Sequence, residues 1–201
     1  TTSSAGKSLL VTGLVRYFKK CGYKSYPFKS QNMSSKAHTL EDGRLISTAQ
    51  ALQAFSAGLK PDVRMNPVLL MPQSNTGSMV VIDGEKYKAM QAREYFDFKV
   101  KLRDHIMEVF EQIEGENDII VIEGAGSPAE INLRDNDIVN MGLAEMVDAP
   151  VILVADIDRG GVFASLYGTV MLLEESERAR IKGLVINKFR GDPTLLESGI
   201  E

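Results

Sequence analysis

Short apolar runs that alternate with helix-like segments constrain the fold of this chain most strongly. Three of them, 118–122, 151–155 and 184–186, have the length of strands and consist largely of Ile, Val and Leu. A continuous run of this kind is typical of a strand that is buried on both faces. Amphipathic segments with helical spacing separate the runs. The pattern therefore predicts an α/β fold, with helices flanking a mostly parallel sheet of the P-loop NTPase type.

The other predicted elements follow from local spacing. Helices are expected from residue 9 to a stop at Gly22 and over 44–57, 92–113, 138–147 and 162–173. Further strands are expected over 23–28, 68–71 and 79–82. Ligands of such sheets bind at the carboxyl ends of the strands, so we expect the functional residues there.

Charge and cysteine content exclude several classes of protein. The 201 residues carry a net charge of -4, whereas general binding to nucleic acid needs a strongly basic face. The longest apolar stretches are far too short to span a bilayer. The one Cys excludes an internal disulfide and fits a reducing compartment. These features predict a cytoplasmic domain that binds neither nucleic acid nor membrane.

The first eight residues, TTSSAGKS, end as a phosphate-binding P-loop does. In such a loop, backbone N–H groups and the lysine hold phosphates, and the serine hydroxyl reaches Mg²⁺. The residues expected to bind the nucleotide here are Thr1, Thr2, Ser3, Ala5, Gly6, Lys7 and Ser8. The usual pattern has glycine at the position of Thr1, so an ordinary helix start is the alternative. A P-loop also follows a strand, and we expect one before Thr1 in the intact protein.

Polar residues follow the predicted strands. Glu123 can hold Mg²⁺ directly or through water, and Lys29 can neutralise charge on a transferring phosphoryl group. Asn187 can bind the edge of a purine ring, and Asp156 and Asp158 can serve the metal or its waters. Each residue also has a purely structural alternative. Glu123 would lie in a solvated turn, Lys29 would be an ordinary surface lysine, and Asn187 would bond to the backbone at the strand end. Asp156 and Asp158 would belong to a salt-bridged loop.

Longer segments carry a resemblance to one family. They are 1–8, 27–34, 49–54, 65–70, 122–135, 155–163 and 186–192. Together they resemble the N-terminal synthetase domain of the cobyric acid synthase family over nearly the whole chain. The resemblance implies a dethiobiotin synthetase-like fold and an enzyme that uses ATP and Mg²⁺. It also implies amidation of peripheral carboxylates of adenosylcobyrinic acid a,c-diamide, which gives adenosylcobyric acid in cobalamin biosynthesis.

The same resemblance implies roles for single residues. Lys7, Lys29 and Glu123 would be catalytic, and Ser8 and Glu123 would hold Mg²⁺. Leu45 stands where the family is expected to have Glu, so Asp42 is the expected replacement as a metal ligand, with the neighbouring Glu41 as the alternative.

Residues 1–201 are predicted to form one synthetase domain. Ammonia would come from glutamine through a C-terminal glutaminase domain of the intact protein. The expected partners are the corrinoid substrate and that domain, and a homodimer stays open.

Three other functions compete with this one. A carboxylating ligase of the dethiobiotin synthetase type has the same fold, but the 127–135 segment argues against it. A partitioning-type switch ATPase would have a lysine at the position of Thr2. A nucleotide-binding module without chemistry is the third alternative.

Overall fold

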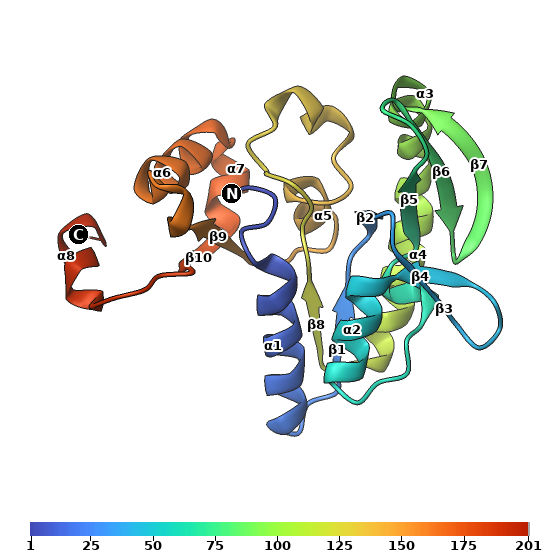
Figure 1. The fold of residues 1–201 in the computed structure, drawn as a ribbon, viewed down its shortest axis with the longest axis horizontal. Helices are drawn as coiled ribbons and strands as arrows, with labels where there is room; N and C mark the ends of the chain where they lie inside the picture. The colour runs from blue at the N-terminus through green and yellow to red at the C-terminus, as the bar shows by residue number, and fades with distance from the viewer. Residues whose placement is uncertain (201) are drawn as a thin grey trace.

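Parallel strand pairs form the centre of the molecule (Figure 1). The computed structural model describes residues 1–200. Strand β1 (Ser25–Phe28) pairs in parallel with β8 (Ile119–Ile122), and β9 (Val151–Asp156) pairs in parallel with β10 (Ile181–Asn187). The predicted α/β class, with parallel strands between helices, is confirmed.

An antiparallel extension adjoins these pairs. Its strands are β2 (Gln31–Met33), β5 (Val68–Pro72), β6 (Gly77–Ile82) and β7 (Glu85–Gln91), and a separate hairpin consists of β3 (Ala37–Thr39) and β4 (Leu45–Ser47). Strand β2 is parallel to β5, whereas β6 and β7 are antiparallel to their neighbours. The sequence predicted β5 and β6 but missed the other four strands, because three of these have only three residues and β7 is largely polar.

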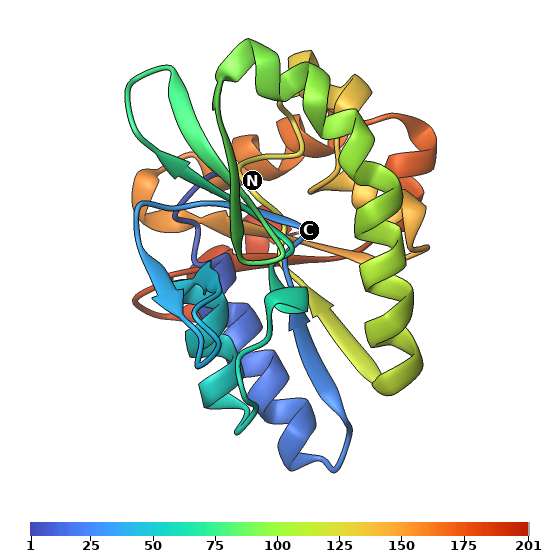
Figure 2. The ribbon, with the colours of Figure 1, turned by 90° about the vertical axis from the view of Figure 1, so that its right-hand side faces the viewer.

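Helices cover both faces of the β1–β8 pair. The helices of the described chain are α1 (Lys7–Lys20), α2 (Thr48–Ser56), α3 (Ala92–Phe98), α4 (Leu102–Glu116), α5 (Met141–Met146), α6 (Val162–Leu172), α7 (Glu175–Arg180) and α8 (Glu197–Ile200), of which α1, α2 and α4 contact this pair. Short 3₁₀ segments are η1 (Val63–Met65), η2 (Lys99–Lys101), η3 (Ile131–Asn136), η4 (Ile157–Arg159) and η5 (Pro193–Leu196). Figure 2 shows α1 and α2 on one side of the pair and α4 on the other. The main core lies between β1 and α4, where Phe28 packs edge-on against Phe110.

Three predicted helices differ from the observed ones. The helix predicted over 44–57 begins only after Ser47, because β4 precedes it and the Ser47 side chain caps it by accepting from the Ala49 amide. The helix predicted over 92–113 is interrupted by η2, which leaves Val100 50% exposed instead of on the apolar stripe. The helix predicted over 138–147 is shorter in the structure, where α5 begins only at Met141. The residues before it form a turn, in which the Asp137 carboxylate accepts hydrogen bonds from the Val139 and Asn140 amides.

Strands β8 and β9 face each other without pairing. Within residues 1–200, no ladder of hydrogen bonds joins them. The residues of β8 are half-buried, and Ile152 of β9 is 55% exposed because it lines the space between the two strands. The prediction that these runs are buried on both faces is therefore wrong for β8, whereas Leu153, Val154 and Ala155 of β9 are buried as predicted.

No helix in the described part of the chain has the length and hydropathy that crossing a lipid bilayer requires.

Candidate functional site

The loop before α1 and the carboxyl ends of β1 and β8 enclose one cleft. Its volume is 550 Å³, and the loop lines it with Ser3, Gly6, Lys7 and Ser8. The strand ends add Lys29 and Glu123. Parallel strands bring their carboxyl ends to the same edge of a sheet, so residues 94 positions apart meet here.

A buried carboxylate stands at the centre of the cleft. Glu123 is 3% exposed, and its Oε1 accepts hydrogen bonds from Ser8 Oγ and Lys29 Nζ, each at 2.7 Å. Its Oε2 accepts from Gln53 Nε2 at 2.7 Å and from Gln50 Nε2 at 3.4 Å. A buried charge is tolerated only when it is paired and hydrogen-bonded, and both conditions hold here.

Sequence reasoning missed the two glutamines. Both are fully buried on α2, and Gln50 also accepts a hydrogen bond from Asn32 Nδ2 at 3.1 Å. Their spacing could have revealed them. Gln50 and Gln53 are three residues apart, so they lie on the same face of the helix, and the apolar pattern places that face toward the core. An amide in a core position must find a partner, and here that partner is the Glu123 carboxylate.

Lys7 bends back over its own loop. Its Nζ donates to the Thr2 carbonyl at 2.9 Å and to the Gly126 carbonyl at 3.0 Å. Burial and then the nearby Lys29 ammonium lower the pKa of Lys7, while Glu123 opposes them. An anion in the cleft would offset both causes, so the site favours negatively charged ligands.

Strand β10 holds the loop from the other side. Asn187 Nδ2 donates to the Ala5 carbonyl at 2.8 Å, and Lys188 Nζ donates to the Ser4 carbonyl at 2.9 Å. Gly6 has a φ of 97°, and a Cβ there would lie 2.1 Å from Asn187 Nδ2. Only glycine fits this contact, which fixes the loop next to β10.

A largely apolar hollow lies beside the loop, along the first turns of α1. It has a volume of 300 Å³ and is lined by Asn187 together with Leu9, Leu10 and Leu14 of α1. Leu9 is 76% exposed, which is unusual for a large apolar side chain unless something covers it. The hollow combines an apolar wall with one amide, whose nitrogen is bonded to the Ala5 carbonyl, and the purine contact expected for Asn187 stays a prediction.

Several predicted residues lie elsewhere. The side chains of Thr1, Thr2 and Ala5 do not line the cleft, so any contact of theirs with phosphates would use the backbone. Asp42 lies exposed in the turn of the β3–β4 hairpin, 2.7 Å from Arg44, and the hairpin projects from the body in Figure 1. Its neighbour Glu41 is likewise exposed and pairs with Lys60. The structure therefore does not bring Asp42 to Ser8 and Glu123.

The acids after β9 are also engaged. Lys188 Nζ lies 2.7 Å from Asp156 Oδ2 and lowers the pKa of that carboxyl, while Asp158 pairs with Arg190 at 3.2 Å. In residues 1–200, no group of three or more acidic, His or Cys side chains could hold a metal by itself. Mg²⁺ commonly keeps several waters and uses one or two carboxylates plus phosphates, so Glu123 with Ser8 fits that need.

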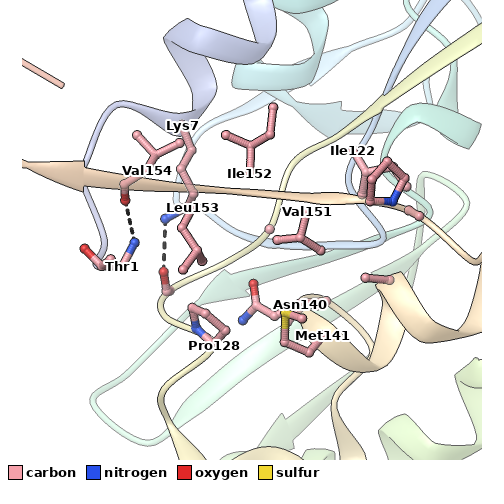
Figure 3. A pocket seen from close by; sticks show the side chains of 16 residues that line it. Thr1, Lys7, Ile122, Pro128, Asn140, Met141, Val151, Ile152, Leu153 and Val154 are labelled. Atoms are coloured by element: carbon pink, nitrogen blue, oxygen red, sulfur yellow. Dashed lines mark hydrogen bonds between the residues drawn. The ribbon is translucent and has the colours of Figure 1, made fainter. Parts of the chain in front are cut away.

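A second cavity, of 130 Å³, lies between β8 and β9 and is drawn in Figure 3. Its walls include Ile122 of β8 and Val151 to Val154 of β9. The Thr1 nitrogen donates to the Val154 carbonyl, which places the start of the loop against β9.

Comparison with known proteins agrees with this geometry. The CbiA family, described as the CobQ/CobB/MinD/ParA nucleotide binding domain, matches residues 1–201. Proteins named cobyric acid synthase are similar over the whole chain: 58% identical in Clostridium acetobutylicum, 57% in Alkaliphilus metalliredigens and 60% in Lachnoclostridium phytofermentans. The chain spans 41%, 40% and 39% of the lengths of these relatives. The chain thus belongs to the CobQ/CobB/MinD/ParA family of nucleotide-binding domains.

Proposed function

We propose that the chain is the ATP-dependent synthetase domain of a cobyric acid synthase, which acts in cobalamin biosynthesis. The observation that carries the proposal is the contact of Glu123 with Ser8 and Lys29 directly beside Lys7. The similarity to cobyric acid synthases at 56–60% identity supports the choice of substrate, adenosylcobyrinic acid a,c-diamide.

The reaction needs activation of an acid. A carboxylate does not react with ammonia, because oxide is too poor a leaving group. In the proposed reaction, a carboxylate oxygen attacks the γ-phosphorus of ATP and ADP leaves, which gives an acyl phosphate. Ammonia then attacks the acyl carbon, phosphate leaves and the nitrogen loses a proton. Such chemistry depends on positioning and on neutralising charge.

Each residue of the cleft has a role in this scheme. Lys7 and the loop amides would bind the β- and γ-phosphates, and Asn187 would bind the adenine edge. Ser8 and Glu123 would hold Mg²⁺, which would supply positive charge to offset that of the phosphates. Lys29 would reduce the repulsion between the incoming carboxylate and the phosphoryl oxygens. Its contact with Glu123 orients the ammonium toward the cleft.

The domain organisation is part of the same proposal. A strand preceding Thr1 would lie between β8 and β9, whose facing edges are unpaired in the described chain and enclose the cavity of Figure 3. The Thr1 nitrogen donates to the Val154 carbonyl, so the end of such a strand would lie beside β9. Because the relatives are longer than this chain, a separate glutaminase domain is proposed to supply the ammonia.

The test supplies ammonia directly. The protein is incubated with ATP, Mg²⁺, ammonium and adenosylcobyrinic acid a,c-diamide, and products are followed by mass spectrometry, since each amidation lowers the mass by one unit. Lys7→Ala and Glu123→Ala should abolish turnover, whereas Lys20→Ala, on the exposed end of α1, should not. Undiminished amidation by either cleft variant would reject the proposed roles. ATP-dependent carboxylation of a diamino acid would favour the ligase alternative.

A further inference from the structure

A third cavity opens beside the phosphate cleft. It has a volume of 370 Å³ and lies between β2, the loop that follows β8, and η2. Ser3, Met33, Ala125 and Gly126 line both the cavity and the cleft, so the two hollows adjoin. A molecule held in this cavity could therefore extend a group toward the phosphates.

Most charges around the cavity are already satisfied within the chain. Arg134 donates to Glu174 Oε1 and to the Leu172 carbonyl, both at 2.6 Å, and lies 3.6 Å from Glu177. Asp137 accepts from the backbone amides of residues 139, 140 and 142, and Glu130 accepts from the Ser127 amide. Each of these groups therefore already has hydrogen-bond partners within the chain.

Lys99 is different. It lines the cavity from η2, and within residues 1–200 its ammonium has neither an ion-pair partner nor a hydrogen-bond acceptor. Its one specific contact is the Phe96 ring, whose centroid lies 4.7 Å from Nζ. Burial lowers the pKa of Lys99, and the negative charge of Asp137 opposes this effect. An anionic ligand gains more binding free energy from a half-buried cation that lacks a counter-ion than from one that is already paired.

We propose that this cavity receives the carboxylate-bearing edge of the acceptor and that Lys99 is the counter-ion of one of its carboxylates. The inference rests on the proposed function and names the place where the substrate lies. The adjoining cleft would hold the γ-phosphoryl group, so an acid arm reaching over Gly126 would meet it. Lys99 would act in binding the acceptor, separately from Lys29, which is hydrogen-bonded to Glu123 in the cleft.

The test compares Lys99→Met with Lys99→Arg and with Lys101→Met, an exposed lysine on the same 3₁₀ segment that does not line the cavity. A lost charge-assisted contact should raise the KM for adenosylcobyrinic acid a,c-diamide roughly tenfold or more in Lys99→Met. The KM for ATP should change less than about twofold, because no phosphate contact is lost. Lys99→Arg should restore most of the affinity, and Lys101→Met should match the wild type.

Equilibrium dialysis, followed by the corrinoid absorbance, gives a readout that does not depend on turnover. The wild type should bind the diamide substrate more tightly than adenosylcobyric acid, in which amides replace carboxylates, and Lys99→Met should lose that preference. Equal binding of both corrinoids by Lys99→Met and the wild type, with normal turnover, would overturn the Lys99 assignment alone. A wild type that neither binds nor amidates the diamide would overturn the proposed function, and this inference with it.

Discussion

Replacing Lys29 by Met should lower the free energy of unfolding, because it leaves the buried Glu123 carboxylate without its cation. The Lys29 and Glu123 side chains are 9% and 2% exposed and their charged atoms are 2.7 Å apart. Removing one partner of such a pair typically costs about 3–5 kcal/mol, because the remaining charge stays buried without compensation. Ser8, Gln50 and Gln53 would still donate to Glu123, so we expect the lower end, about 3 kcal/mol.

Urea unfolding followed by circular dichroism measures this loss. For an m-value of about 2 kcal/mol/M, a loss of about 3 kcal/mol lowers the midpoint by roughly 1.5 M. Lys60→Met is the matched control, because Lys60 and Glu41 form an ion pair of similar length, 2.6 Å, whose side chains are 73% and 81% exposed. That variant should unfold at the wild-type midpoint.

A double variant separates charge burial from simple loss of packing. In Lys29→Met with Glu123→Gln, a neutral amide replaces the unpaired carboxylate and can still accept from Gln53. The double variant should recover at least about 1 kcal/mol relative to Lys29→Met alone. A midpoint for Lys29→Met within about 0.3 M of the wild type would refute the reasoning, because it would mean that Glu123 is solvated.

Three further predictions concern the loop and its neighbours. Gly6→Ala should destabilise the fold by about 2 kcal/mol or more, because φ is positive at this position and the added Cβ collides with Asn187. Thermal melting measures the loss, and an unchanged melting temperature would contradict the described loop. Asn187→Ala removes the bond to the Ala5 carbonyl and should therefore weaken the binding of both ATP and tripolyphosphate in calorimetric titration. The loss should be roughly tenfold larger for ATP, which also loses a contact to its base, and an equal loss for both ligands would contradict that contact. Anion binding needs protonated Lys7, whose pKa is lowered below its usual 10.5, so ATP affinity should fall as the pH rises through a value below that of an ordinary lysine. Lys7→Ala should lack this dependence, and the same pH profile in both proteins would assign the titration to another group.

The positions of the main strands and of the P-loop residues could be predicted from the sequence, because apolar runs and glycine-rich turns are local signals. The approach of Lys29 and Glu123 also followed, since both residues succeed predicted parallel strands. The break at η2 did not follow, because the apolar spacing of 92–113 continues across Lys99 without a glycine or proline.

The partners of Glu123 lay beyond sequence reasoning for a different reason. Gln50 and Gln53 come from a helix that is far from Glu123 in the sequence, and only the packing of α2 against β1 and α1 brings them together. Asp42 shows the reverse error. Asp42 is close in the sequence to Leu45, where the resemblance places a metal ligand, and this suggested that Asp42 binds the metal. In the structure, the β3–β4 hairpin instead exposes Asp42 to solvent beside Arg44.

The most direct test of the central claim, that Lys7, Ser8 and Glu123 form one site for a nucleotide and its metal, is calorimetric titration with ATP in the presence and absence of Mg²⁺. Wild-type protein should bind ATP more tightly with Mg²⁺ than without it. Lys7→Ala should lose most of the affinity under both conditions, and Glu123→Gln should lose mainly the gain that Mg²⁺ provides. Wild-type affinity that does not respond to Mg²⁺, or ATP binding that survives Lys7→Ala unchanged, would contradict the account.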